Sequence, residues 1–209
     1  MEKKYEITNI EMTWNGHILH RIKALKDFTL INGKEIHKGD LGGWVENENN
    51  LSQEGLCWIY EECKMCDNAR RSGNSIGYGN SQQYGNSRQY GNSQQCGDSQ
   101  QFGYSIQSEN SRQYGNSRQF GNSIQYDNSR QCGNSQQYGH SQQHGNSRQY
   151  GNSQQYENSC QSGNSKQFGN SKADKDMRLS GNSLFETEED IVILKSPTSG
   201  RQITIGSDK

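Results

Sequence analysis

The sequence predicts an all-β fold, a solenoid wound from a six-residue repeat that runs through residues 54–185. The plainest copy of the repeat is Gln83–Arg88, which reads Gln-Tyr-Gly-Asn-Ser-Arg. Every sixth residue from Ser75 to Ser171 is Ser, and every sixth residue from Gln83 to Gln167 is Gln. The only proline, Pro197, lies outside the repeat. A strict register without proline indicates an ordered array.

The hexads resemble the hexapeptide repeat of left-handed parallel β-helices, in which an inward aliphatic residue is followed four places on by an inward small residue. On that template each hexad is a short strand and a corner, and three hexads form a triangular coil of 18 residues. Ser-x-Gln would be the strand, with Ser and Gln inward. Tyr-Gly-Asn would be the corner, because Gly and Asn accept positive φ most easily. Residues 54–185 would make about seven coils.

The corner residues differ when they are sorted with a period of 18. A featureless six-residue polymer would not require such a difference, so it supports a coil of three hexads. One column, made of corner residues 18 apart, is aromatic and reads Tyr84, Phe102, Phe120, Tyr138 and Tyr156. A second such column is mostly small or polar, and a third alternates Tyr with Cys.

The two inward positions are apolar near the ends of the array and polar in its middle. An inward Gln in place of Val gives up roughly 1.5–3 kcal/mol of hydrophobic driving force, and a buried amide without partners adds a penalty. We therefore expect the Gln amides to bond to those above and below, with Ser hydroxyls or internal water taking the spare N–H groups. The predicted core ladder comprises Gln83, Gln89, Gln95, Gln101, Gln107, Gln113, Gln119, Gln125, Gln131 and Gln137 with Ser75, Ser81, Ser87, Ser93, Ser99 and Ser105. The apolar plugs at the Gln position would be Ile59, Met65, Arg71 and Gly77 at one end and Ala173, Leu179 and Phe185 at the other.

Two caps are expected, an N-terminal β cap at residues 1–53 and a C-terminal hairpin cap at residues 186–209. In the first, residues 6–14 and 17–25 read as strands joined by Asn15-Gly16, the strongest two-residue hairpin signal, and residues 34–43 read as a loop. In the second, residues 186–190 read as an acidic turn, followed by strands at 191–194 and 202–205 that would blunt the edge of the last coil.

The segments IKALKDF (22–28), KGDLGGWV (38–45) and NLSQEG (50–55) carry a more specific resemblance. They resemble a family of bacterial and phage-encoded hexapeptide-repeat proteins of the left-handed β-helix type, whose repeats usually read Val-Tyr-Gly-Asn-Ala-Arg. The resemblance covers nearly the whole chain and implies the β-helix fold; some members are labelled acyltransferases on the fold alone. This sequence departs from the family at both inward positions, with Gln for Val and Ser for Ala.

Composition leaves one competing interpretation. Only 27% of residues are hydrophobic, the formal net charge is -1 and the mean hydropathy is -1.20. A chain rich in Gln, Asn, Gly, Ser and Tyr is also typical of prion-like disordered or amyloid-forming segments, although a fixed register argues against disorder. No signal peptide or membrane-spanning stretch is apparent, so we expect a cytoplasmic (host-cell) or virion-associated protein without a membrane partner.

Catalytic and metal sites are not expected, and no cofactor is predicted. β-Helix enzymes commonly place catalytic or metal-binding His residues at a cleft between subunits, but the repeat holds only His140 and His144, at corners on different edges. Cys63-x-x-Cys66 resembles half of a zinc site and lacks a second Cys/His pair at finger-like spacing. The six cysteines are expected to be reduced thiols.

The predicted function is that of a non-enzymatic structural or interaction solenoid of phage or prophage origin. It would present flat faces or cysteine-bearing edges to an unknown protein partner or to another copy of itself. The alternative is an acyltransferase-like trimer with its site between subunits. A candidate binding stripe for nucleic acid or an acidic glycan, which would otherwise be a solvated face, comprises Arg112, Arg130, Arg148 and Lys166. Stacked aromatic corners beside it would be base or sugar platforms, or a ladder that staples the coils.

Overall fold

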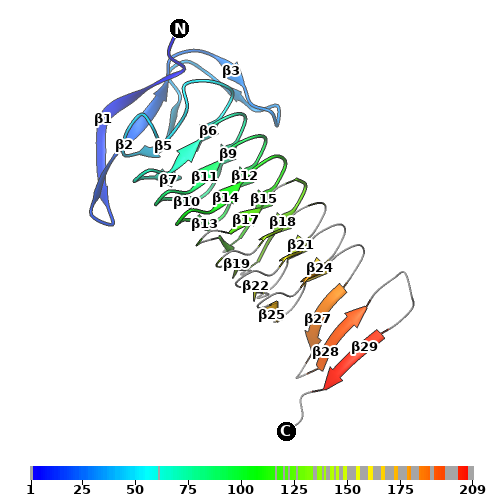
Figure 1. The fold of residues 1–209 in the computed structure, drawn as a ribbon. Helices are drawn as coiled ribbons and strands as arrows, with labels where there is room; N and C mark the ends of the chain where they lie inside the picture. The colour runs from blue at the N-terminus through cyan, green and yellow to red at the C-terminus, as the bar shows by residue number, and fades with distance from the viewer. Residues whose placement is uncertain are drawn as a thin grey trace.

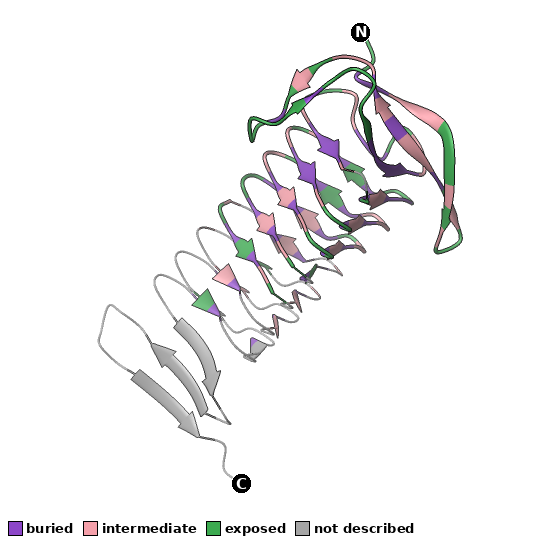
Figure 2. Cartoon of the chain, turned by 180° about the vertical axis from the view of Figure 1, so that it is seen from behind, coloured by how far each residue is buried: buried purple, intermediate pink, exposed green. Residues whose placement is uncertain are grey.

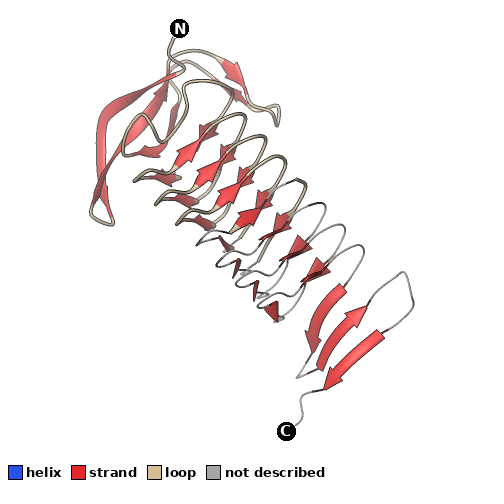
Figure 3. Ribbon diagram, viewed as in Figure 1, coloured by secondary structure: helices blue, strands red, loops and turns tan. Residues whose placement is uncertain are grey.

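In the residues that it describes, the computed structural model is a rod of strands and connecting loops (Figures 1 and 3). It describes residues 2–60, 62–115, 117–119, 121, 123–125, 127–133, 136–137, 139, 142–143, 145, 148–149, 154–155, 160–161, 166–167, 172–173, 178–179, 184–188, 191–195 and 202–206. Among these residues no helix is long and apolar enough to cross a bilayer.

The N-terminal hairpin forms where Asn15-Gly16 predicts it. Strand β1 (Tyr5–Trp14) pairs antiparallel with β2 (His17–Ala24), and both turn residues have positive φ, 49° and 84°. A small ribbon of β3 (Phe28–Thr29) and β4 (Glu35–Ile36) follows. Strand β5 (Leu41–Val45) pairs antiparallel with β2 and parallel with the first repeat strand on its face, so it joins the cap to the solenoid.

Residues 34–43 are therefore not the loop that the sequence predicts, because β4 and the start of β5 lie within them. Two glycines account for the difference. A Cβ at Gly42 would meet Ile22 Cγ1 at 2.6 Å, and a Cβ at Gly43 would meet the Tyr60 carbonyl oxygen at 2.6 Å. Gly42 and Gly43 thus permit close packing of β5 rather than marking a turn.

The solenoid has three faces made of two-residue strands. Each strand pairs in parallel with the strand 18 residues further on, as Gln82 does with Gln100, which confirms the three-hexad coil of a left-handed β-helix-like solenoid. The first face contains β7 (Lys64–Met65), β10 (Gln82–Gln83), β13 (Gln100–Gln101), β16 (Arg118–Gln119), β19 (Gln136–Gln137), β22 (Gln154–Gln155) and β25 (Lys172–Ala173).

The other two faces are built in the same way. The second face contains β8 (Arg70–Arg71), β11 (Arg88–Gln89), β14 (Ile106–Gln107), β17 (Ile124–Gln125), β20 (Gln142–Gln143), β23 (Cys160–Gln161) and β26 (Arg178–Leu179). The third face contains β6 (Trp58–Ile59), β9 (Ile76–Gly77), β12 (Gln94–Gln95), β15 (Arg112–Gln113), β18 (Arg130–Gln131), β21 (Arg148–Gln149) and β24 (Lys166–Gln167).

The corners adopt positive φ at the Gly position, as expected. The residues that replace Gly there do the same: φ is 56° at Asp67, 55° at Glu109 and 59° at Asp127. Glu157, the fourth such exception, lies outside the described residues. Stacked corners also approach closely, since a Cβ at Gly85 would lie 3.0 Å from the backbone nitrogen of Gly103.

The polar residues of the repeat line the interior, and the predicted Gln and Ser core positions are buried (purple in Figure 2). Their hydrogen bonds differ from the expected amide ladder. Gln107 Nε2 donates to the carbonyl oxygens of Gln94 (2.8 Å) and Ser111 (3.2 Å), and Gln95 donates in the same way to Gln82 and Ser99. The core Gln amides from Gln95 to Gln125 thus bind the backbone of their own coil, whereas the amide of Gln89 has no hydrogen-bond partner in the described part.

The apolar plug at the N-terminal end contains two buried cations. Ile59 and Met65 pack in the main hydrophobic cluster, but Arg71 is also buried, and burial lowers its pKa to about 10. Lys4 Nζ is buried against the carbonyl oxygen of Cys57 at 3.0 Å, and burial lowers the pKa of Lys4 as well. Arg71 thus points inward, as its place in the repeat predicts, but the plug around it is not wholly apolar. At the far end Ala173 and Leu179 are buried as expected; the side chain of Phe185 lies outside the described part.

The C-terminal end is an antiparallel sheet added to the third face. Strand β27 (Leu184–Glu188) pairs with β24, and it is followed by β28 (Ile191–Lys195) and β29 (Gln202–Gly206). The hairpin of β28 and β29 is where the sequence places it. The predicted acidic turn is wrong for residues 186–188, because β27 continues through Glu188, and residues 189–190 lie outside the described part.

Candidate interaction surface

The outward residues of the third face form the candidate surface. Arg112 pairs with Arg130, Arg130 with Arg148, and Arg148 with Lys166, each in parallel register across β15, β18, β21 and β24 (Figure 1). Parallel neighbours lie about 4.8 Å apart. The four cations predicted from the sequence therefore make one continuous row along the rod, which is called the basic row below.

The basic row lacks acidic partners in the described part of the chain. The ion pairs found there all join cap residues or residues of the first corner. None of the outward strand positions on the third face between Trp58 and Lys166 carries a carboxylate. Arg130 and Lys166 are exposed, whereas Arg112 and Arg148 are half-buried. Like charges stacked on one face repel each other, so an anion placed along the row would relieve that repulsion.

Aromatic residues follow all three faces: Tyr84 and Phe102 follow the first, Tyr90 the second, and Tyr60, Tyr78 and Tyr114 the third. Tyr114 adjoins the basic row, and its hydroxyl accepts a hydrogen bond from Arg112 Nη1 at 3.4 Å. In the aromatic column the rings of Tyr84 and Phe102 stack, with centroids 5.0 Å apart and planes 2° apart, whereas Phe120, Tyr138 and Tyr156 lie outside the described residues. That column follows the first face, however, and the second face follows it in turn. The aromatics on the edge beside the basic row are instead those that follow the third face, where Tyr60 and Tyr78 stack with ring centroids 4.9 Å apart.

The thiols of the cysteine-bearing edge are half-buried and hydrogen-bonded. Cys96 and Cys132 are half-buried, and their thiols donate to the carbonyl oxygens of Gln113 (3.5 Å) and Gln149 (3.6 Å). Burial raises the pKa of Cys96 to about 12 and raises the pKa of Cys132. Since the thiolate is the nucleophile, these thiols are poor candidates for covalent chemistry at neutral pH.

The other candidate residues fall in separate places. Cys63 belongs to the main hydrophobic cluster, whereas Cys66 packs in a second cluster with Leu19 and Trp44. The two cysteines of the Cys-x-x-Cys sequence therefore do not share a site. His140 and His144 lie outside the described residues, and the described histidines all belong to the cap.

Comparison with known proteins gives one short match. No family model matches the chain. The protein named "Uncharacterized acetyltransferase YdcK" from Escherichia coli (strain K12) is 33% identical over 66 residues, which is 28% of this chain. The matched part spans 19% of that relative's length. This match and the stacked 18-residue coils agree with the resemblance of the repeat to the hexapeptide repeat of left-handed β-helices. The chain fits a hexapeptide-repeat β-helix family. Its polar core departs from the repeat usual in that family.

Proposed function

We propose that the chain is a rigid, non-enzymatic interaction rod that binds a linear polyanion along the basic row. The observation that carries the proposal is the unbroken register of Arg112, Arg130, Arg148 and Lys166. A polyanion with repeated phosphate, sulfate or carboxylate groups matches a straight row of cations, because each contact releases a condensed counterion. We further propose that the protein is phage or prophage encoded, which the resemblance of its N-terminal segments supports.

The test compares two pairs of substitutions with the same change in charge. Arg112→Gln/Arg130→Gln removes adjacent cations from the basic row, and Arg70→Gln/Arg88→Gln removes adjacent, exposed cations from the second face. Binding is measured by fluorescence anisotropy with a labelled oligothymidylate and with heparin, across a range of salt concentrations. On the nucleic-acid arm, each lost phosphate contact should reduce the slope of log affinity against log salt by about 0.7.

We expect the third-face pair to weaken binding and to reduce the slope by about 1.4, for two contacts, while the second-face pair changes neither. The ligand that still binds at the higher salt concentration, oligothymidylate or heparin, shows whether the polyanion is a nucleic acid or a sulfated glycan. Equal losses in both pairs would mean non-specific attraction to any cation, and an absence of binding on both arms would overturn the proposal.

The match to an acetyltransferase favours a second function, acyl transfer at a site between subunits. It requires a self-associated protein that turns over acetyl-CoA. Light scattering coupled to size-exclusion chromatography and a thiol-release assay with acetyl-CoA would test it. A monomer without acetyl-CoA hydrolysis or transfer would leave the interaction rod as the sole function proposed.

A further inference from the structure

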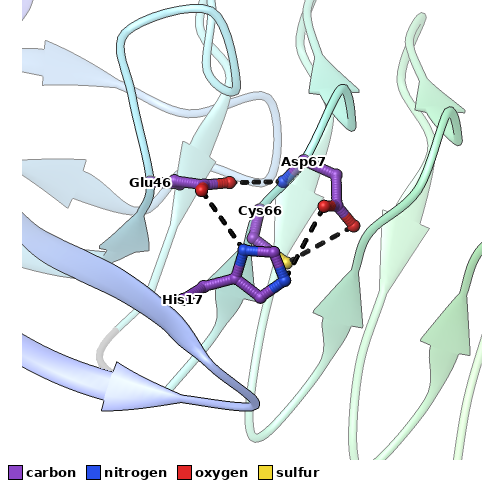
Figure 4. A group of neighbouring side chains, drawn as sticks. All are labelled: His17, Glu46, Cys66 and Asp67. Atoms are coloured by element: carbon purple, nitrogen blue, oxygen red, sulfur yellow. Dashed lines mark hydrogen bonds and ion pairs between the residues drawn. The ribbon is translucent and has the colours of Figure 1, made fainter.

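Four metal-ligating side chains meet where the cap joins the solenoid (Figure 4). His17 begins β2 directly after the Asn15-Gly16 turn, and Glu46 follows the last residue of β5. Cys66 and Asp67 form the corner after β7. Strands β2, β5 and β7 are neighbours in one sheet. The sheet order therefore brings together residues that are far apart in the sequence.

The distances suit a single small ion. His17 Nδ1 lies 3.2 Å from Glu46 Oε1, and His17 Nε2 lies 3.7 Å from Asp67 Oδ1. Cys66 Sγ lies 3.9 Å from Asp67 Oδ2. One ligand atom from each residue can be chosen so that all four lie within 4.8 Å of one another. A tetrahedron with metal–ligand distances of about 2.0–2.3 Å has ligands about 3.3–3.8 Å apart, so small side-chain rotations would close this group around an ion.

We propose that His17, Glu46, Cys66 and Asp67 bind a divalent transition-metal ion of the Zn²⁺ class. Imidazole nitrogen and thiolate sulfur select Zn²⁺ and its neighbours over Mg²⁺ and Ca²⁺, which take oxygen ligands. One nitrogen, one sulfur and two carboxylate oxygens complete four-coordination without a ligand from outside the chain. This site is independent of the polyanion proposed for the basic row.

The surrounding structure holds the ligands in place. Asp67 has a positive φ of 56°, and its Oδ2 accepts a hydrogen bond from the Gly85 backbone N–H at 2.9 Å. Glu46 Oε2 accepts a hydrogen bond from the Asp67 N–H at 2.6 Å. Such outer bonds orient metal ligands and are a regular part of metal sites.

Burial of the site is graded, which gives an ion both a closed side and an entry. Cys66 is buried beside Leu19 and Trp44, with Met12, Trp14 and Tyr84 packed against that cluster. The side chains of His17, Glu46 and Asp67 are 29%, 32% and 38% exposed. The ion would enter from the carboxylate side and complete its coordination at the buried sulfur. Bound there, it would tie the tip of the first hairpin to the first corner of the rod.

Cobalt binding to the whole chain tests the site directly. The protein, prepared with chelator and reductant, is titrated with Co²⁺, then with Zn²⁺ as competitor. Thiolate-to-cobalt charge transfer in the near ultraviolet reports on Cys66, and visible d–d bands report on four-coordination. The test variants are His17→Gln and Cys66→Ser. The matched controls are His20→Gln, whose His lies 3.5 Å from Glu11 on the same hairpin, and Cys96→Ser, a thiol at a corner.

We expect one Co²⁺ per chain, displaced by Zn²⁺. Cys66→Ser should lose the charge-transfer band, His17→Gln should bind about tenfold more weakly or worse, and both controls should match the unsubstituted protein. Zn²⁺ should raise the melting temperature of the unsubstituted protein by more than that of His17→Gln at the same metal concentration. Should Cys66→Ser not fold, X-ray absorption at the zinc edge of the unsubstituted protein must show one sulfur neighbour. No stoichiometric binding, a band that survives in folded Cys66→Ser, or a zinc edge without sulfur would each overturn the site and leave only a His–carboxylate hydrogen-bond network.

Discussion

The guanidinium group of Arg71 fills the space that a side chain on Gly77 would need inside the solenoid. A Cβ atom at residue 77 would overlap Arg71 Nη1 and lie 3.0 Å from its Cζ. Both residues occupy the inward position that Gln holds in later hexads. Arg71 Nη2 donates to Oε1 of Gln83 (3.3 Å) and of Gln95 (3.0 Å). Arg71 therefore joins the apolar plug to the polar core, and Gly77 makes room for it.

Restoring the Gln of the repeat at Gly77 should destabilise the protein. Gly77→Gln should lose about 1–3 kcal/mol of unfolding free energy, the usual cost of overpacking a core. The double variant Arg71→Gln/Gly77→Gln should recover much of that loss, because it recreates two ordinary hexads. Urea unfolding of the unsubstituted protein, Arg71→Gln, Gly77→Gln and the double variant gives the coupling energy. A coupling near zero would contradict the contact between Arg71 and Gly77.

The inward and outward positions of the solenoid could be predicted because the repeat itself encodes them. A period of six puts every Ser and Gln of a hexad on the same side of a short strand, so the burial of Gln107 follows from sequence alone. The bonds of that Gln do not follow. Its acceptor Gln94 is 13 residues earlier, a spacing that has no meaning until the coil is wound. Among the described residues, no protein group donates a hydrogen bond to Oε1 of Gln107. The predicted hydrogen bonds between stacked Gln amides, one strand spacing apart, are therefore not formed at this residue.

The candidate sites show the same division. The basic row was predictable, because its members recur every 18 residues. The group of His17, Glu46, Cys66 and Asp67 was not predictable as a group, although Cys66 was noted in Cys63-x-x-Cys66, because its members lie at the ends of three strands that only the order of the sheet brings together. The inward position of Arg71 followed from the repeat, but its contacts with Gln83, Gln95 and the space at Gly77 did not. The signal in the sequence is that a cation, Arg71, and a residue without a side chain, Gly77, occupy successive Gln positions of the repeat.

An ionisable replacement at a core Gln should make stability depend on pH. Gln107→Glu places a carboxylate against the carbonyl oxygens of Gln94 and Ser111, where only a donor fits. Burial raises the folded-state pKa of that carboxyl above its unfolded value of about 4.3, so the stability of the variant is greatest below pH 4.3 and is lost as pH rises. At neutral pH the loss should be about 3–5 kcal/mol.

Gln142→Glu is the matched control for that substitution. Gln142 occupies the outward position of β20 and its side chain is exposed, so the change should alter the unfolding free energy by less than about 0.5 kcal/mol. Both variants are followed by denaturant unfolding at acidic and neutral pH. A Gln107→Glu protein as stable at neutral pH as in acid would mean that the residue 107 side chain reaches water.

Relieving positive φ at one corner should stabilise the rod. Glu109 has φ of 55° at a position where most hexads have Gly, and left-handed backbone costs a residue with a side chain about 1 kcal/mol or more. Glu109→Gly should therefore gain about 1 kcal/mol. Glu109→Ala removes the same carboxylate but keeps the strain, so it should gain nothing. Equal melting temperatures for the two variants would show that backbone strain at this corner is negligible.

The buried hydroxyl of Tyr5 should support the cap at neutral pH and less so in alkali. It donates to the Leu51 carbonyl oxygen, so Tyr5→Phe should lose about 0.5–1.5 kcal/mol. Burial, followed by the nearby Cys57 and Glu48, raises the pKa of Tyr5 above the unfolded value of about 10. Above pH 10 the unfolded chain releases the proton first, so this contribution is present below pH 10 and is lost as pH rises. The difference in unfolding free energy between the unsubstituted protein and Tyr5→Phe should be smaller at about pH 11 than at about pH 8. Tyr104→Phe, at a tyrosine that is 66% exposed, controls for removal of a phenol. A difference that stays constant with pH would place the Tyr5 hydroxyl in water.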